Sequence, residues 1–207
     1  MNESPSNKII ADHPHPFESL YKRLSSIASM DEDAWQAFSS SVQVRTLESR
    51  EILWPSGSIC KYLVFVKSGL IRSHSMVSDR QITSTFYPEE SLFYDDYSFL
   101  SQQPMTKTYE ALEPTKLLLI SRERLLQLFD KYKVFERIGR LAVEQAHIKM
   151  IEAQERISQW SADDNYHYLQ KHQPDILQRV PQKIIASYLN ISPEHLSRIR
   201  AKVAGRT

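Results

Sequence analysis

The sequence predicts an α+β protein in which a barrel or sandwich of short strands precedes a long helix and a helix-turn-helix. Between residues 45 and 120, short apolar or alternating runs are separated by turn residues, which is typical of strands. After Ser121 the apolar residues recur at helical spacing. Near the end of the chain, two short helical patterns follow one another with almost no loop, which indicates two closely crossing helices.

The composition is that of a globular protein, because 41% of the 207 residues are hydrophobic, enough to bury a core. The single cysteine, Cys60, cannot form an internal disulfide, which favours a reducing compartment and a buried thiol. No apolar run approaches the roughly 18 residues of a membrane-spanning helix. The N-terminus also lacks the basic and apolar regions of a signal peptide. We therefore expect a cytoplasmic protein with no membrane partner.

Basic residues are concentrated at the C-terminal end, although the net charge is only +1. From Arg179 onward the chain carries a charge of +5, with Glu194 as its one acidic residue, so the rest carries −4. A basic segment on a mildly acidic body is typical of a phosphate-binding module attached to another domain. A solvated helix face is the alternative interpretation.

The predicted strands include the runs "YLVFV" (62–66), "LIRSHSMV" (70–77) and "KLLLI" (116–120). Turn signals between such runs are Pro55-Ser56-Gly57, Ser68-Gly69 and Ser78-Asp79. Several short strands at this spacing indicate a barrel or a sandwich.

The region after Ser121 predicts a helix of roughly 25–35 residues, capped by Ser121 and broken near Val134. Because the barrel can cover only its first turns, a second copy of the helix is the simplest partner, and a two-fold homodimer follows. The alternative is a helix that lies along its own barrel. The predicted dimer seam consists of Phe135, Ile138, Leu141, Gln145 and Ile148.

A further helix is expected after Ser161, which forms a capping box with Asp164. The expected domain organisation is then N-terminal helices and barrel in residues 1–120, a long dimerisation helix in 121–160 and a DNA-binding domain in 161–207.

The stretch "VPQKIIASYLNISPEHLSRIRAKV" (180–203) predicts a helix-turn-helix. The first helix begins at Gln182, and Asn190 after it readily adopts the left-handed conformation of a tight turn. Ser192 can cap the second helix, Pro193–Val203, because proline at the first position loses no hydrogen bond. Leu196, Ile199 and Val203 then face the first helix.

The outward face of Pro193–Val203 is polar and basic, which favours DNA binding over a structural hairpin. The side chains expected to reach base edges are Glu194, His195, Ser197 and Arg198. Those expected to contact phosphates are Lys183, Arg200 and Lys202.

This order of parts resembles the family of the cyclic-AMP receptor protein and the fumarate-and-nitrate-reduction regulators (Crp/Fnr). The resemblance covers roughly Leu24 to Val203 and is strongest in "ICKYLVFVKSGLIR" (59–72) and "QRVPQKIIASYLNISPEHLSRIR" (178–200), which is similar to Bacteroidetes-type members. It implies a jelly-roll (double-stranded β-helix) barrel of the cyclic-nucleotide-binding type in a dimeric transcription regulator. The implied partners are a palindromic double-stranded DNA site, RNA polymerase and an unknown small-molecule effector.

By motif position, Glu194 and Arg198 match base-contacting residues of that family, whereas Pro193 replaces a contacting arginine. The operator sequence therefore cannot be transferred from the family.

The barrel departs from the family pattern in "YDDYSFLSQQPMTKTYEAL" (94–112). Cyclic-nucleotide binders have Gly-Glu-Leu for the ribose and, about ten residues on, an arginine for the cyclic phosphate. The corresponding positions here, and thus the candidate effector pocket, are Asp95, Asp96, Tyr97, Thr106 and Lys107. Without the arginine the bidentate phosphate partner is missing, and Asp95 adds a like charge. We therefore expect no cyclic-AMP binding in the usual way; the alternative is a cyclic-nucleotide response through Asp96 and Lys107.

Other chemistries find little support in the residues. An iron–sulfur cluster needs several cysteines, and a lone strand histidine such as His74 is more often a packed polar residue than a haem ligand. We expect no cofactor and no metal. No nucleophile–base pair or phosphate-binding glycine loop indicates an enzyme. A protein-interaction module without DNA binding remains the other alternative.

Overall fold

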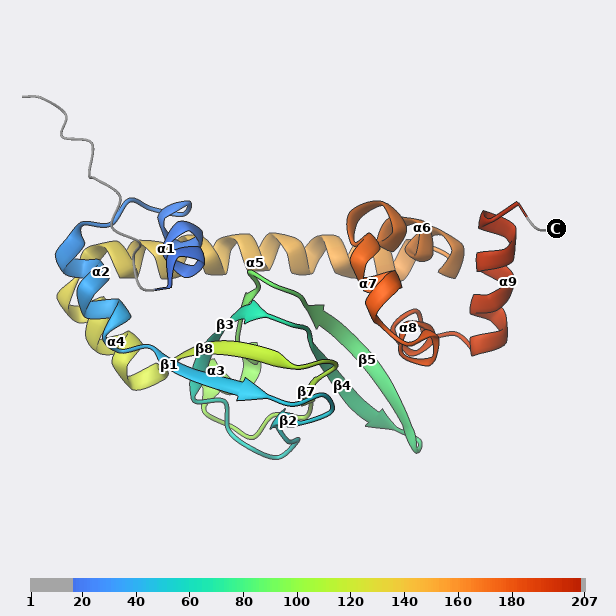
Figure 1. Ribbon diagram of the computed structural model, residues 1–207, viewed down its shortest axis with the longest axis horizontal. Helices are drawn as coiled ribbons and strands as arrows, with labels where there is room; N and C mark the ends of the chain where they lie inside the picture. The colour runs from blue at the N-terminus through green and yellow to red at the C-terminus, as the bar shows by residue number, and fades with distance from the viewer. Residues whose placement is uncertain (1–16, 206–207) are drawn as a thin grey trace, which may run out of the picture.

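The computed structural model describes residues 17–205, arranged along one long axis (Figure 1). Two short helices, α1 (Glu18–Ser25) and α2 (Glu32–Ser39), precede the strands. Helix α4 (Arg122–Lys131) follows the strands, and α5 (Lys133–Gln159) runs from there to a cluster of helices at the other end. That cluster comprises α6 (Ala162–His172), α7 (Pro174–Arg179), α8 (Gln182–Tyr188) and α9 (Pro193–Val203).

The strands form two four-stranded antiparallel sheets, in the orders β1-β8-β3-β6 and β2-β7-β4-β5. Their bounds are β1 (Gln43–Leu47), β2 (Ile52–Trp54), β3 (Tyr62–Ser68), β4 (Ile71–Val77), β5 (Arg80–Tyr87), β6 (Leu92–Phe93), β7 (Thr108–Ala111) and β8 (Thr115–Ser121). The short helix α3 (Asp96–Ser101) follows β6. This two-sheet arrangement confirms the predicted jelly-roll fold within an α+β protein.

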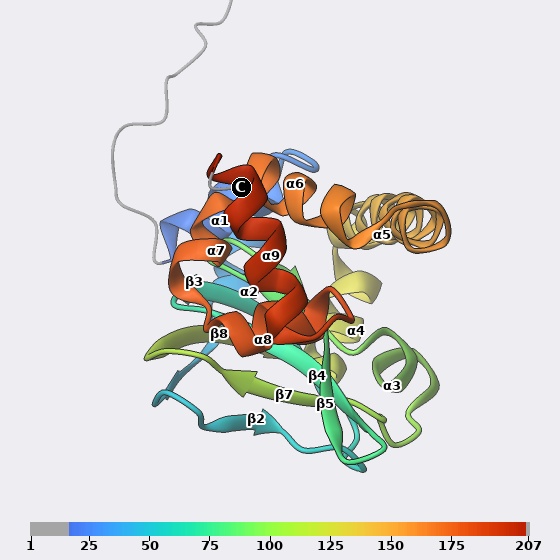
Figure 2. The same cartoon turned by 90° about the vertical axis from the view of Figure 1, so that its right-hand side faces the viewer.

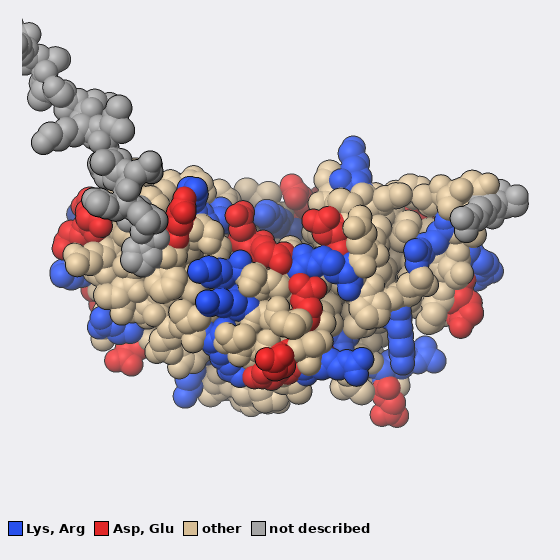
Figure 3. All heavy atoms as spheres, in the orientation of Figure 1, with Lys and Arg blue, Asp and Glu red and all other residues tan. Residues whose placement is uncertain are grey.

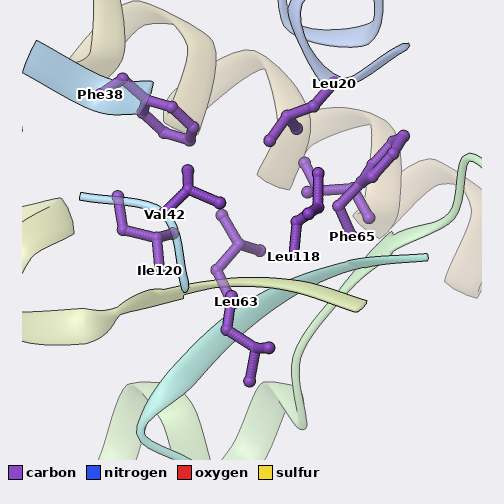
Figure 4. A pocket seen from close by; sticks show the side chains of 9 residues that line it. Leu20, Phe38, Val42, Leu63, Phe65, Leu118 and Ile120 are labelled. Carbon is purple, nitrogen blue, oxygen red and sulfur yellow. The ribbon is translucent and has the colours of Figure 1, made fainter. Parts of the chain in front are cut away.

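The apolar runs of β3 and β8 reflect burial on both faces of the first sheet. One face lies toward the barrel interior, and the other is covered by α1 and α2 (Figure 4). Between these helices and the sheet remains a void of about 10 Å³ lined by apolar side chains such as Leu20, Phe38 and Leu118. A void of this size and lining holds at most one water molecule, so it is a packing defect rather than a ligand site.

Turn chemistry at the β4–β5 hairpin follows the sequence prediction. Ser78 and Asp79 have φ values of 45° and 62°, the left-handed conformations that a tight hairpin turn requires. The hairpin extends from the barrel toward α8 (Figures 1 and 2).

The helical region after Ser121 is divided at Tyr132, two residues before the expected break. Tyr132 has an extended backbone, with φ −127° and ψ 106°, and its hydroxyl donates to Asp33 Oδ2 of α2 at 2.9 Å. Helix α5 then has 27 residues, within the predicted range.

The first two residues of the predicted dimer seam, Phe135 and Ile138, are already buried within the single chain. Phe135 and Ile138 are 2% and 5% exposed within the single chain, and the Phe135 ring stacks on Phe38 of α2 at 5.3 Å. These two side chains therefore belong to the core of their own chain. Only the barrel was considered as a cover for this helix, whereas α2 also packs against it.

The C-terminal helices match the expected helix-turn-helix, with one addition. Helix α8 begins at Gln182, α9 spans Pro193–Val203, and Ser161 with Asp164 forms the capping box of α6. The addition is the short helix α7 between α6 and α8, with Pro174 in its first turn.

We predict that Ile138→Ala lowers the free energy of unfolding by about 2–5 kcal/mol, the cost of a core cavity. Leu126→Ala is the control, because Leu126 on α4 is 41% exposed and should change stability by only about 0.5 kcal/mol. Urea unfolding and light scattering measure both variants. An Ile138→Ala protein that kept its stability but dissociated would restore Ile138 to the dimer seam.

Candidate nucleic-acid interface and the barrel interior

The two helices of the helix-turn-helix are held together by a small apolar core. Ile185 and Ala186 of α8 and Leu196 and Ile199 of α9 are at most 3% exposed. Asn190 has φ 53°, and the amide of Ile191 donates to the carbonyl of Ala186 at 3.0 Å, which closes the turn. The left-handed asparagine therefore sets the crossing of the two helices.

Ser192 fixes the start of α9 and its first outward side chain. Its hydroxyl accepts from the amide of His195 at 3.2 Å, as an N-cap should. A hydrogen bond with Ser192 also lowers the pKa of the exposed Glu194, and Arg198, one turn along the same face, acts in the same direction. Glu194 is thus an ionised acceptor held at the N-terminal end of the helix.

The side chains predicted to read bases share this outward face of α9. Glu194, Ser197 and Arg198 are exposed, and His195 is partly exposed. Helix α9 forms the end of the molecule toward which α5 points, with α8 between it and the barrel (Figures 1 and 2). No part of the described chain covers this face.

The predicted phosphate-contacting residues divide into two kinds. Lys183 and Arg200 are exposed. Lys202, also exposed, lies 3.2 Å from Asp163 Oδ1 at the start of α6, so part of its charge is neutralised within the chain. Lys and Arg side chains are visible over the end formed by α8 and α9 on the face that Figure 3 shows.

The space between the two sheets of the barrel is filled by aromatic rings. Tyr87 stacks on Phe93 with ring centroids 4.1 Å apart, and Tyr109 packs against Trp54 at 5.1 Å and Phe93 at 5.9 Å. These rings join β2, β5, β6 and β7 across the barrel. The interior is therefore packed by the protein's own side chains at this point.

Asp95 is buried in this interior and hydrogen-bonded to its neighbours. It is 5% exposed, its Oδ2 accepts from the Tyr109 hydroxyl at 2.9 Å, and its Oδ1 accepts from the amide of Ser98 at 2.9 Å. Burial raises the pKa of Tyr109, so the hydroxyl remains protonated and donates. Asp95 thus stabilises the start of α3 and the aromatic cluster.

The other residues of the candidate effector pocket lie in the first turn of α3 and in the loop before β7. Asp96, Tyr97 and Thr106 are exposed, and Lys107 is partly exposed. Partial burial of the carboxylate raises the pKa of Asp96, and the charge of Lys107 opposes that rise. The structure therefore brings Asp96 near Lys107, while it places Asp95 on the interior side and leaves Thr106 in a surface loop.

A buried polar cluster on the outer face of the second sheet was not anticipated. Arg72, 4% exposed, donates from Nε and Nη2 to Glu110 Oε2 at 3.0 and 2.7 Å. His74 Nε2 lies 3.4 Å from the same oxygen, and burial, followed by the charge of Arg72, lowers the pKa of His74. The histidine is therefore a packed polar residue, as expected. The alternating pattern "IRSHS" indicates that Arg72 and His74 lie on the outer face of the sheet. It could not indicate their partner, because Glu110 is 38 residues away from Arg72 in the sequence.

Within residues 17–205, no three His, Cys, Asp or Glu side chains are placed to hold a metal ion. Over the same residues, every helix is too short or too polar to cross a bilayer. Cys60 is buried with a free thiol, as predicted.

Comparison with known proteins identifies the barrel. Residues 44–132 match the family described as the cyclic nucleotide-binding domain. A search of curated proteins gives no match to the chain.

Among solved structures, the Thermus thermophilus catabolite activator protein is 18% identical with a TM-score of 0.55, over 88% of this chain and 87% of that one. The c-di-GMP-responsive global regulator CLP of Xanthomonas campestris is 18% identical, with a TM-score of 0.63 over 84% and 92% of the two chains. A CooA mutant from Carboxydothermus hydrogenoformans is 14% identical, with a TM-score of 0.66 over 88% and 84%.

These likenesses extend beyond the barrel to the helices that follow it, at identities that establish the fold. Residues 44–132 therefore match the cyclic nucleotide-binding domain family, and the chain shares the fold of the catabolite activator protein and CLP structures.

Proposed function

We propose that this protein is a dimeric, DNA-binding transcription regulator. The observation that supports this most directly is the exposed polar face of α9, which carries Glu194 and Arg198 at the end of the molecule. In this proposal residues 1–120 are the sensor unit, 121–160 the dimerisation segment and 161–207 the DNA-binding unit. Selection of bound DNA from a random pool tests the proposal, and recovery of a palindromic sequence is the expected result.

The proposed reading of bases depends on Arg198. We expect Arg198→Ala to reduce affinity for the selected DNA by about 1–3 kcal/mol and to relax preference at one position of each half-site. Arg200→Ala should weaken all sequences alike and reduce the salt dependence of binding, as loss of a phosphate contact does. Titrations with selected and scrambled DNA at several salt concentrations measure both effects. Equal behaviour of the two variants on both DNAs would contradict the assignment.

Dimerisation requires an apolar seam on α5, and the helix offers two. Val143, Ala146, Met150 and Ala153 are spaced four and three residues apart and include no charged position. The other stripe holds Leu141, Ile148 and Ile151 together with Glu144, which a two-fold axis would bring near its own copy. We therefore propose the first stripe as the seam. Leu141, Gln145 and Ile148, the remaining members of the seam predicted from sequence, form the competing prediction.

Met150 and Ile148 allow a matched test, because they are 56% and 57% exposed within one chain. Met150→Glu should give monomers, since each carboxylate would be buried against its own copy, whereas Ile148→Glu should remain dimeric. Light scattering at several protein concentrations separates the outcomes. Monomers from Ile148→Glu alone would restore the seam predicted from sequence.

A second candidate function is a cyclic-nucleotide response, favoured by the family of residues 44–132 and by the proximity of Asp96 and Lys107. We propose that it does not operate in the usual way. Asp95 is already bonded to Tyr109, and no arginine takes the place of Thr106. Without the bidentate, charge-assisted contact of an arginine with the cyclic phosphate, affinity for cyclic AMP should be at least about tenfold lower than in a pocket that has this arginine.

Calorimetry with cyclic AMP and cyclic GMP tests this expectation on the unaltered protein. We expect no binding at micromolar ligand. Micromolar binding that Lys107→Ala or Asp96→Ala abolished would instead establish the alternative response through these two residues.

A further inference from the structure

The helix-turn-helix rests on the barrel of its own chain. Helix α8 lies against β5, where the Tyr188 ring packs on Phe86 at 5.1 Å and the Ser187 and Thr83 hydroxyls are 2.7 Å apart. Leu70 and Phe86 share an apolar cluster with the C-terminal helices. The sensor unit and the DNA-binding unit are thus joined by a direct contact as well as by α5.

Beside this contact, Arg179 at the end of α7 binds two carboxylates of the barrel. Its Nη1 and Nη2 each lie 2.8 Å from an oxygen of Glu89, which makes the contact bidentate. Nη2 also lies 2.5 Å from Glu113 Oε1, and Nε lies 3.3 Å from Glu113 Oε2. All three nitrogens of the guanidinium are therefore engaged with the barrel.

The two carboxylates come from different turns, and a third turn holds them in place. Glu89 precedes β6, Glu113 precedes β8, and the amide of Gly69, before β4, donates to Glu89 Oε1 at 2.8 Å. Gly69 has φ 95°, and a Cβ there would lie 2.4 Å from Thr115 Oγ1. The same Thr115 hydroxyl donates to the carbonyl of Glu113 at 2.8 Å. The three turns thus form one built socket for Arg179.

The position of Arg179 along the chain links this socket to the placement of α8 and α9. It lies between buried Ile176 and buried Val180, and only Val180 and Pro181 separate it from α8. Because α8 and α9 share a core, a displacement of Arg179 moves α9 with it. We propose that Arg179 is a positioning residue for DNA recognition, which fixes α9 relative to α5 and thereby sets the spacing between the two half-sites of a dimer's DNA.

This inference rests on the proposed DNA binding, and it gives Arg179 a role other than the basic charge expected from the sequence. Arg179 was counted with the basic tail, but Glu89 and Glu113 of the barrel neutralise its charge. The hydrogen bonds from Arg179 lower the pKa of Glu89 to about 2. The contact therefore persists throughout the physiological pH range and is lost only as the pH falls toward that value. Its partly exposed charges make it sensitive to salt instead.

The test uses the palindrome selected by the unaltered protein, with one, two or three base pairs inserted at its centre. Each insertion separates and rotates the half-sites, so a rigid dimer should discriminate strongly against it. Arg179→Gln should reduce this discrimination by about tenfold without changing preference at any base. Arg45→Gln is the control, because the Arg45–Glu51 pair is another arginine–glutamate contact that lies wholly within the barrel unit. Unchanged discrimination in Arg179→Gln would overturn the proposal.

The double variant Glu89→Gln/Glu113→Gln distinguishes positioning from a direct phosphate contact. It leaves Arg179 intact but removes its partners, so positioning predicts the same loss of spacing discrimination. If Arg179 acted by binding phosphate, freeing its guanidinium would raise affinity at every spacing equally, and the proposal would fail.

A disulfide provides the rescue. Thr83→Cys/Ser187→Cys, placed where the hydroxyls are 2.7 Å apart, should restore strict spacing to Arg179→Gln when oxidised and lose it again when reduced. An oxidised protein that stayed tolerant of all spacings would contradict a positioning role. This arm also excludes general misfolding, because a misfolded protein would not regain discrimination.

Hydrogen exchange on the DNA-free protein separates this inference from the proposed function. Arg179→Gln and Glu89→Gln/Glu113→Gln should raise exchange in α8 and the facing part of β5, whereas Arg45→Gln should not. If the unaltered protein selected no DNA, the proposed function would fail even where exchange confirmed the docking. Unchanged exchange, with DNA binding intact, would reject the socket alone.

Discussion

The burial of Leu70 and Phe86 beneath the C-terminal helices is the contact on which the arrangement of this molecule depends. Apolar area removed from water supplies attraction without fixing direction. The polar contacts around it supply direction: Thr83 with Ser187, and Arg179 with its two carboxylates. Without the apolar contact, these partly exposed polar pairs would compete with water and contribute little. Together the apolar and polar contacts hold the C-terminal helices in a fixed orientation against the barrel.

The helix-turn-helix could be predicted almost to the residue because its determinants are local. Asn190, Ser192 and Pro193 each act on backbone within a few positions. The cover over Phe135 could not be predicted, because its stacking partner Phe38 is nearly a hundred residues away and the N-terminal helices had been given no role. Similarly, Arg179 was assigned by its charge alone, since Glu89 and Glu113 become its neighbours only after the jelly roll forms.

The barrel keeps the jelly-roll backbone, while the side chains in its interior differ from those of cyclic-nucleotide binders. The resemblance directed attention to Asp95 and Thr106 as replacements for ligand contacts. In the structure Asp95 has an internal partner in Tyr109, within a set of rings that span both sheets. A buried carboxylate with its hydrogen bonds satisfied costs less than an empty polar cavity. The sequence could locate the substitution, but only the packing explains how the interior tolerates it.

The length of α5 imposes a mechanical requirement on its base. At 27 residues it is a lever about 40 Å long. A tilt of about 5° at the first residue of α5 would displace its far end by about 3.5 Å. The packing of Gly139 against the Phe129 ring, where an added Cβ would lie 2.9 Å from the nearest ring carbon, leaves little freedom for such a tilt. The orientation of the C-terminal helices relative to the barrel thus depends on a glycine near the opposite end of the protein.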